Sequence, residues 1–282
     1  MNFAICNETF APLSSTTFQH WSFSKTCRCA ATLGYQAVEL APFTFYSHPE
    51  VAVRSITPAK RDVIRKTAED AGLKIVGLHW LLVQTQGLHL TSPDSAVRKA
   101  TREYTEALVD FCADVGGTLL VWGSPKQRNL ADGITKQQGL EFAAEIFRGV
   151  MPRCEARGVT LCIEPLGRKE TNFINTAAEG AWLAATVNHP RCALHLDVKA
   201  MTDEGTPIPD IIRSHGNLLR HFHANDPNLR GPGQGDVDHA PIAAALREIG
   251  YKGYVSVEVF DYTPDPETIA RQSIEYMKRV YV

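Results

Sequence analysis

The chain alternates between two hydrophobic patterns along its whole length. Short runs of apolar and β-branched residues, typical of buried strands, are followed by polar turns and then by stretches with apolar residues at helical spacing. The runs that predict strands are Asn2–Cys6, Gln36–Leu40, Lys74–His79, Thr118–Trp122, Val159–Glu164, Cys192–Asp197, Leu219–His223 and Tyr254–Glu258. The stretches that predict helices are Thr17–Leu33, Pro58–Ala71, Pro93–Val115, Lys136–Arg157, Ala177–Thr186, Ile208–His215, Pro241–Ile249 and Pro266–Val280.

Strand and helix units alternate eight times in 282 residues, which predicts a closed (β/α)₈ TIM barrel of the α/β class, formed by a single domain over residues 1–282. The alternative is an open doubly wound sheet, which usually binds phosphate through a glycine-rich loop after its first strand. The segment after Cys6 reads NETFAPL and contains no such loop. The barrel is therefore the preferred architecture.

Four predicted strands end in side chains that bind metal ions. Glu164, Asp197, His223 and Glu258 follow apolar residues at the ends of the fifth to eighth predicted strands. The catalytic groups of TIM barrels lie at the C-terminal ends of the strands, so these four side chains should meet. Three carboxylates and an imidazole suit one divalent ion, with Mn²⁺, Mg²⁺, Co²⁺ and Zn²⁺ as candidates. Without a cation, the carboxylates would repel one another and raise one another's pKa.

These strand ends resemble those of the xylose isomerase-like barrels, the sugar phosphate isomerase/epimerase superfamily that includes ketose 3-epimerases, inosose dehydratases and endonuclease IV. The resemblance is clearest from the fifth predicted strand to the C-terminus and is consistent with the whole chain. It implies that Glu164, Asp197, His223 and Glu258 bind one divalent metal ion, with Mn²⁺ as the first choice.

The resemblance also implies an activity, which is proton transfer on a sugar or sugar-like ketone through a metal-stabilised enediolate. In ketose 3-epimerases, glutamates that match Glu164 and Glu258 lie on opposite faces of the substrate, where one removes the proton and the other returns it. One alternative uses the same site as a lyase or dehydratase acting on a keto-sugar, an inosose or a 3-keto-glycoside. Another is a sugar-binding barrel without activity, which would not need four metal ligands.

Several further residues are candidates for binding the substrate. Glu170 matches a glutamate that contacts substrate hydroxyls in the epimerases. His79 and Trp122 end the third and fourth predicted strands, where a polar ring and an aromatic face suit a sugar pocket. Asp226 lies in the polar loop after His223, where it can bind a hydroxyl or cap a turn.

Two positions depart from the epimerase pattern. Ala200 stands where the epimerases carry a histidine, and Leu229 stands where they carry an arginine. Lys199 and Arg230 are the adjacent residues, and they are the candidates to contact the substrate oxygens instead. The two departures keep the lyase alternative open.

Composition and charge narrow the expected partners. The net charge of −2 gives no basic surface of the kind that binds nucleic acid. Endonuclease IV carries zinc-binding histidines at three positions where this chain has Trp122, Ala200 and Asp238, so a nuclease is not expected. The chain shows neither a signal-peptide pattern nor an apolar run that could span a membrane, so we expect a cytoplasmic protein without membrane partners. Its odd count of seven cysteines favours reduced thiols. The expected partner is a carbohydrate, and a homo-oligomer is left open.

Overall fold

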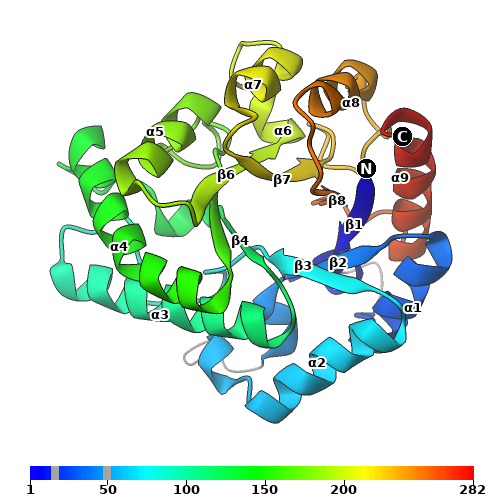
Figure 1. Ribbon diagram of the computed structural model, residues 1–282, viewed down its shortest axis with the longest axis horizontal. Coiled ribbons are helices and arrows are strands. Elements are labelled where there is room, and N and C mark those ends of the chain that lie inside the picture. The colour runs from blue at the N-terminus through cyan, green and yellow to red at the C-terminus, as the bar shows by residue number, and fades with distance from the viewer. Residues whose placement is uncertain (14–18, 47–51) are drawn as a thin grey trace.

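The strands of this computed structural model, which describes residues 1–13, 19–46 and 52–282, close into a parallel barrel (Figure 1). Each strand pairs with the next, and β8 pairs with β1, so the predicted TIM barrel is confirmed. The strands are β1 (Asn2–Cys6), β2 (Ala37–Leu40), β3 (Lys74–Leu78), β4 (Leu119–Trp122), β5 (Thr160–Ile163), β6 (Cys192–Asp197), β7 (Leu219–Ala224) and β8 (Tyr254–Val257).

Helices form a ring around the outside of this barrel (Figure 1). They are α1 (Phe23–Leu33), α2 (Pro58–Asp70), α3 (Ser95–Asp114), α4 (Lys136–Arg157), α5 (Ala177–Val187), α6 (Val198–Met201), α7 (Ile208–His215), α8 (His239–Glu248) and α9 (Pro266–Val280). Short 3₁₀ turns occur at Asn7–Phe10, Pro42–Phe45, Ala52–Ser55 and Pro125–Gln127. Within the described residues, no helix is both long and apolar enough to cross a membrane.

Apart from shifts of one or two residues at helix ends, the helices differ from the sequence prediction at one boundary and by one additional short helix. The first predicted helix began at Thr17, which lies outside the described residues, but α1 begins only at Phe23. Ser22 sets that start because its side chain accepts a hydrogen bond from the backbone N–H of Lys25, as a helix N-cap does. The short helix α6 was not predicted, and it begins directly after Asp197, whose side chain caps it.

Side chains alternate between the inside of the barrel and the helical layer, as strand geometry requires. A compact cluster of small and branched residues fills the interior: Ala4, Ala37, Val76, Leu119, Val121, Cys162 and Ala193. Towards the carboxyl ends, the same inward positions become polar, as at Glu39, His195 and Asp197, all of which are buried. The fold thus gathers its buried charges at one end of the barrel.

Candidate active site

A cavity of about 540 Å³ opens at the carboxyl ends of the strands. Its volume falls in the range of about 300–1,000 Å³ that small-molecule sites occupy. Aromatic and apolar groups such as Trp80, Phe260 and Leu166 form part of its wall. The charged and polar candidates from the sequence that line it are Glu164, Glu170, Asp197, Glu258, His79 and Lys199. The cavity therefore combines the apolar wall and the few convergent polar groups of a binding site.

Glu164, Asp197 and His223 lie together beside this cavity. One donor atom from each of them, and one from His195, all lie within 4.8 Å of one another. Asp197 and His223 are neighbours because their strands, β6 and β7, pair in parallel with these two residues in register. All four side chains are buried. Three of the four predicted ligands thus lie close together, and the group also contains a histidine that the sequence analysis did not select.

Glu258 joins this cluster through His223 and is held by a tryptophan. Its Oε2 lies 3.1 Å from Nδ1 of His223, and its Oε1 accepts a 2.8 Å hydrogen bond from the indole N–H of Trp80. Trp80 adopts a left-handed backbone conformation with φ of 51°, and its ring stacks on Phe260 with centroids 6.0 Å apart. Such strain in a non-glycine residue is typical of functional sites. Both oxygens of Glu258 are therefore fixed.

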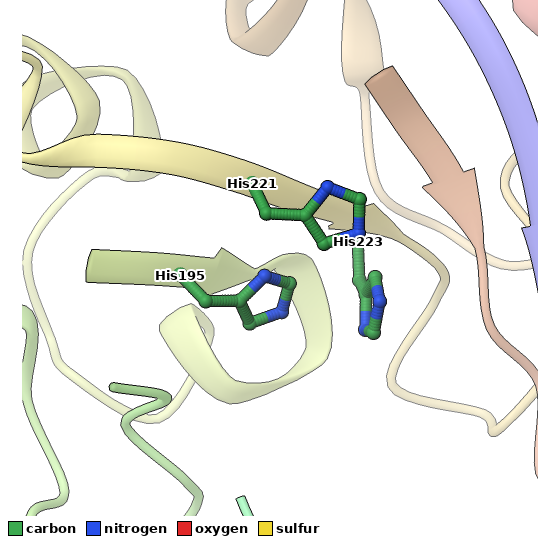
Figure 2. A group of neighbouring side chains, drawn as sticks. All are labelled: His195, His221 and His223. Atoms are coloured by element: carbon green, nitrogen blue, oxygen red, sulfur yellow. The ribbon is translucent and has the colours of Figure 1, made fainter. Parts of the chain in front are cut away.

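Glu39 contacts the ring nitrogen of His223 that faces away from Glu258. Its carboxylate lies 2.7 Å from Nε2 of His221 and 3.1 Å from Nε2 of His223. Figure 2 shows His221 and His223 on β7 with His195 on the neighbouring strand. A carboxylate that engages one ring nitrogen leaves the other nitrogen to bind a metal ion, as in carboxylate–histidine–metal arrangements. In His223, the nitrogen left for this role is Nδ1, which faces Glu258.

A second set of contacts positions Asp197. Its Oδ1 accepts a hydrogen bond from the backbone N–H of Ala200, and its Oδ2 accepts one of 2.6 Å from the side chain of Asn225. Asn225 in turn accepts a 2.9 Å hydrogen bond from the backbone N–H of Lys199. The ammonium group of Lys199 lies 2.8 Å from the carboxylate of Glu170, and both line the cavity. Lys199 therefore brings a positive charge to the substrate side of Asp197.

The surroundings of Glu164 and Glu258 shift the pKa values of these two carboxyl groups in opposite directions. Burial, together with the negative charge of Glu258, raises the pKa of Glu164 to about 8. Burial would also raise the pKa of Glu258, but the charge and hydrogen bond of His223 outweigh it and lower that pKa. Burial raises the pKa of Asp197 despite the opposing charge of Lys199. Two carboxyl groups whose pKa values are pushed apart are a common arrangement for an acid and a base in one site.

His79 lines the cavity beside a buried carboxylate that the sequence analysis also missed. Its Nε2 lies 2.6 Å from Oε2 of Glu8, and both residues are fully buried. Burial opposes a charge on His79, but Cys6 and Glu8 raise its pKa well above the ordinary value. His79 therefore brings a second positive charge to the acidic end of the barrel.

Two residues that were not predicted shape the position of Glu164. Arg128 is fully buried, and its guanidinium group donates hydrogen bonds to the backbone carbonyls of Glu164 and Ile174. Gly123, the residue after β4, leaves the space that the Glu164 carboxylate occupies, since a Cβ there would lie 2.0 Å from Oε2. Neither role has a sequence signal, because both depend on contacts between separate strands and loops.

Trp122 does not reach the cavity, which corrects its prediction as a substrate contact. Its side chain is only 1% exposed and packs edge-on against Phe147 of α4, with ring centroids 5.5 Å apart. The reason is strand alternation: Val121 points into the barrel, so Trp122 points into the helical layer. Trp122 is a core residue.

Asp226 and Arg230 do not line the cavity, and their side chains contact other residues instead. The buried carboxylate of Asp226 accepts hydrogen bonds from the backbone N–H groups of Gly233 and Val237, so it organises the loop after β7. Arg230 pairs with Asp261 at 2.9 Å, and its side chain is 46% exposed. Of the two candidates to replace the family's histidine and arginine, only Lys199 lines the cavity.

A sugar-sized cavity lined with acids at the carboxyl ends of barrel strands defines a TIM-barrel enzyme of small-molecule metabolism. A family model described as a xylose isomerase-like TIM barrel matches residues 27–280. The chain therefore belongs to the xylose isomerase-like TIM-barrel family, which confirms the resemblance read from the sequence.

Individual relatives narrow the class further. The D-psicose 3-epimerase of Agrobacterium fabrum is 31% identical over 249 residues, which cover 85% of this chain and 81% of the relative. The D-psicose 3-epimerase of Ruminiclostridium cellulolyticum is 31% identical over 237 residues, covering 82% of this chain and 75% of the relative. A crystal structure of a D-psicose 3-epimerase in the presence of D-fructose matches with a TM-score of 0.83 at 25% identity, covering 100% of this chain and 99% of that one. The chain is an enzyme of the sugar isomerase/epimerase class, and the relatives favour epimerisation over the lyase alternative.

Proposed function

We propose that this enzyme epimerises a ketose at the carbon next to its carbonyl, which is C3 in a ketohexose. One of Glu164 and Glu258 removes the proton from this carbon, and the other delivers a proton to its opposite face. The observation that carries the proposal is that both carboxyl groups, from the ends of β5 and β8, line one cavity together with Asp197. Inversion at carbon needs a base on one face and an acid on the other. The relatives that are D-psicose 3-epimerases support a ketose as the substrate.

The donor set fits a divalent metal ion. Glu164, Asp197 and His223, whose donor atoms lie within 4.8 Å of one another, would hold it together with Glu258, which contacts His223. Burial, and then the charge of Glu258, raises the pKa of Glu164, which a bound cation would offset. Three carboxylates with an imidazole suit Mn²⁺, Co²⁺, Mg²⁺ or Zn²⁺. When bound there, a divalent ion supplies Lewis-acid polarisation of the ketone carbonyl and stabilises the negative charge of the enediolate.

The remaining residues have roles that follow from their contacts. Trp80 and His223 fix the two oxygens of Glu258, so that this carboxylate is aimed before the substrate arrives. The Lys199–Glu170 pair offers a cation and an anion to the hydroxyl groups of the sugar. The faces of Trp80 and Phe260 give an apolar wall for its C–H surface.

The test of this proposal is incubation of the Mn²⁺-loaded enzyme with D-fructose, D-psicose, D-tagatose and L-ribulose in D₂O, followed by NMR. We expect interconversion of C3 epimers, with deuterium incorporated at C3 and no loss of water from the sugar. Release of water or of a leaving group would favour the lyase alternative instead. Absence of both exchange and turnover on every ketose would reject the proposal.

The Gly123→Ala substitution should lower kcat by about 10²-fold, since a displacement of about 1 Å in a catalytic group has this effect. The added Cβ would lie 2.0 Å from Oε2 of Glu164, so the carboxylate must move. Steady-state kinetics on the best ketose measure the loss. Gly149→Ala in α4 is the matched control, because its Cβ would meet only the flexible side chain of Arg102, and its kcat should stay close to that of the wild type.

Metal affinity should rise with pH between about pH 6 and 8 and then level off. In the metal-free protein, burial and neighbouring charges raise the pKa of Glu164 to about 8, so the carboxyl group holds a proton below that pH. Binding requires the carboxylate and releases this proton, which predicts a change of up to about tenfold in Kd per pH unit below the pKa. Calorimetric titration with Mn²⁺ in buffers of different ionisation enthalpy measures both quantities. A pH-independent Kd without proton release would contradict the prediction.

A further inference from the structure

The cavity at the carboxyl ends of the strands is larger than the sugar unit on which the proposed reaction takes place. A ketohexose has twelve non-hydrogen atoms. Even at the share of about 30 Å³ that a whole water molecule takes in the liquid, these atoms would fill at most about 360 Å³. The cavity measures about 540 Å³. About a third of it therefore remains for another part of the ligand.

The groups that suit a sugar come from one part of the barrel. Glu164, Asp197 and Glu258 follow or end β5, β6 and β8, and the Lys199–Glu170 pair also lines the cavity. Each strand of the closed barrel pairs with the next, so β3 and β4 lie across it from β7 and β8. The loops after β3 and β4 supply another side of the cavity, which we call the β3–β4 wall and which consists of residues 83–84 and 124–127.

Hydrogen bonds between its two loops build the β3–β4 wall without a ligand. The backbone N–H of Leu82 donates to the hydroxyl oxygen of Ser124 at 3.2 Å, and the side-chain amide of Gln127 donates to the carbonyl of Leu82 at 3.1 Å. Three residues that line the cavity here have left-handed backbones, namely Trp80, Gln84 and Ser124, with φ of 51°, 63° and 42°. Such conformations persist where the surrounding structure enforces them, and they cluster at ligand-binding sites.

The β3–β4 wall offers a ligand an apolar surface. The hydroxyl oxygen of Ser124 and the amide N–H of Gln127 are already engaged by Leu82. Val83 and Pro125 line the cavity there, and Leu13 and Leu166 line it as well, whereas Gln84 and Lys126 of the wall are exposed to solvent. A sugar hydroxyl buried without a hydrogen-bond partner costs free energy, whereas burial of an apolar group is favourable. This part of the cavity therefore suits an apolar group.

We propose that the natural substrate is a ketose with an apolar substituent, an alkyl or aryl group on one of its terminal oxygens, and that the β3–β4 wall binds this substituent. The inference rests on the proposed epimerisation at Glu164 and Glu258, and it adds the chemical class of the substrate. The ketose unit lies at these two carboxyl groups, and the substituent extends along Val83 and Pro125 towards the exposed end of the wall.

The experiment compares ketoses that differ only in their substituent, with the Mn²⁺-loaded enzyme. They are D-fructose, its 1-O-benzyl and 6-O-benzyl ethers, and the two disaccharides in which glucose is linked to O1 or O6 of fructose. Exchange of the C3 proton in D₂O, followed by NMR, gives kcat/KM for each. At least one benzyl ether should exceed D-fructose by about tenfold or more, since burial of an aromatic group contributes a factor of this size. The disaccharides, whose substituent is polar, should show no such gain.

A substitution in the β3–β4 wall tests the location of the substituent. Val83→Asn places an amide where the benzyl group packs, so the ratio of kcat/KM for the preferred benzyl ether to that for D-fructose should fall by about tenfold. Val63→Asn is the matched control, because it makes the same chemical change in α2 at a side chain that is 62% exposed. This control should keep the wild-type ratio.

The outcomes separate this inference from the proposed function. If D-fructose is epimerised at least as well as both benzyl ethers, the apolar substituent is wrong and the epimerase stands. A gain for the disaccharides that exceeds that of the benzyl ethers would also overturn the inference, in favour of a second sugar unit. An unchanged ratio in Val83→Asn would remove the substituent from the β3–β4 wall. If no ketose of the set exchanges its C3 proton, the proposed function fails and the inference fails with it.

Discussion

Glu258→Gln and Glu164→Gln are each expected to lower epimerisation by about 10²–10⁴-fold, the usual contribution of a positioned acid or base. Glutamine keeps the shape of the side chain and its hydrogen-bonding oxygen, but it cannot take up or return the proton. For Glu258, the amide can still meet Trp80 and His223, so the loss should appear in kcat rather than in folding. Steady-state kinetics in both directions of the reaction measure the effect.

Isotope exchange separates the roles of the two glutamates. Each variant retains one carboxylate, so it should still exchange the C3 proton of the one epimer whose C–H bond faces that residue. The two variants should therefore act on opposite epimers when exchange with D₂O is followed by NMR. Glu170→Gln is the matched control within the same cavity, and it should raise KM more than it lowers kcat. Turnover near the wild-type level in either Glu164→Gln or Glu258→Gln would remove these residues from the mechanism.

His223→Ala is expected to abolish metal retention and, with it, turnover. The ring is fully buried and lies between Glu39 and Glu258, so its loss removes both a proposed ligand and the contact that links Glu258 to the cluster. Metal content measured by mass spectrometry, on protein purified without chelator, should fall from about one ion per chain to below about a tenth.

Two further variants separate metal loss from misfolding. His223→Gln keeps an amide that can donate to Glu39, so it should remain folded while losing most of the metal. His239→Ala removes another buried histidine, whose Nδ1 lies 2.6 Å from the hydroxyl oxygen of Tyr281, and it should keep its metal. If the folded His223→Gln protein kept a full complement of metal, the proposed ligand set would be wrong.

The strand pattern predicts the barrel and its charged end. The sequence analysis did not apply the alternation of side-chain direction along each strand. Period-two alternation already places Val121 inside the barrel and Trp122 outside it, so the prediction of Trp122 as a pocket residue was avoidable. The same rule places His195 on the face of Asp197, which is a signal that the sequence analysis did not use. The loop residues Asp226 and Arg230 offered no comparable periodicity, and their partners lie in other turns.

Other features had no local signal at all. Gly123 matters because Glu164 comes within 2.0 Å of its absent Cβ, and Trp80 matters because its indole meets Glu258 from a distant part of the chain. The separation of the two glutamate pKa values likewise depends on which charges become neighbours after the barrel closes.

The sequence by itself determined the eight strand–helix units, the inward and outward positions of each strand, and the acids and histidine at the strand ends. These follow from local periodicity, which acts over a few residues. Only the tertiary structure decided that Glu39 contacts His223, that Trp80 donates to Glu258, and that His195 lies beside Glu164 without a hydrogen-bond partner among the described residues. The physical reason is that these contacts join different strands across a closed barrel, where distance and burial are set by the register of the whole sheet.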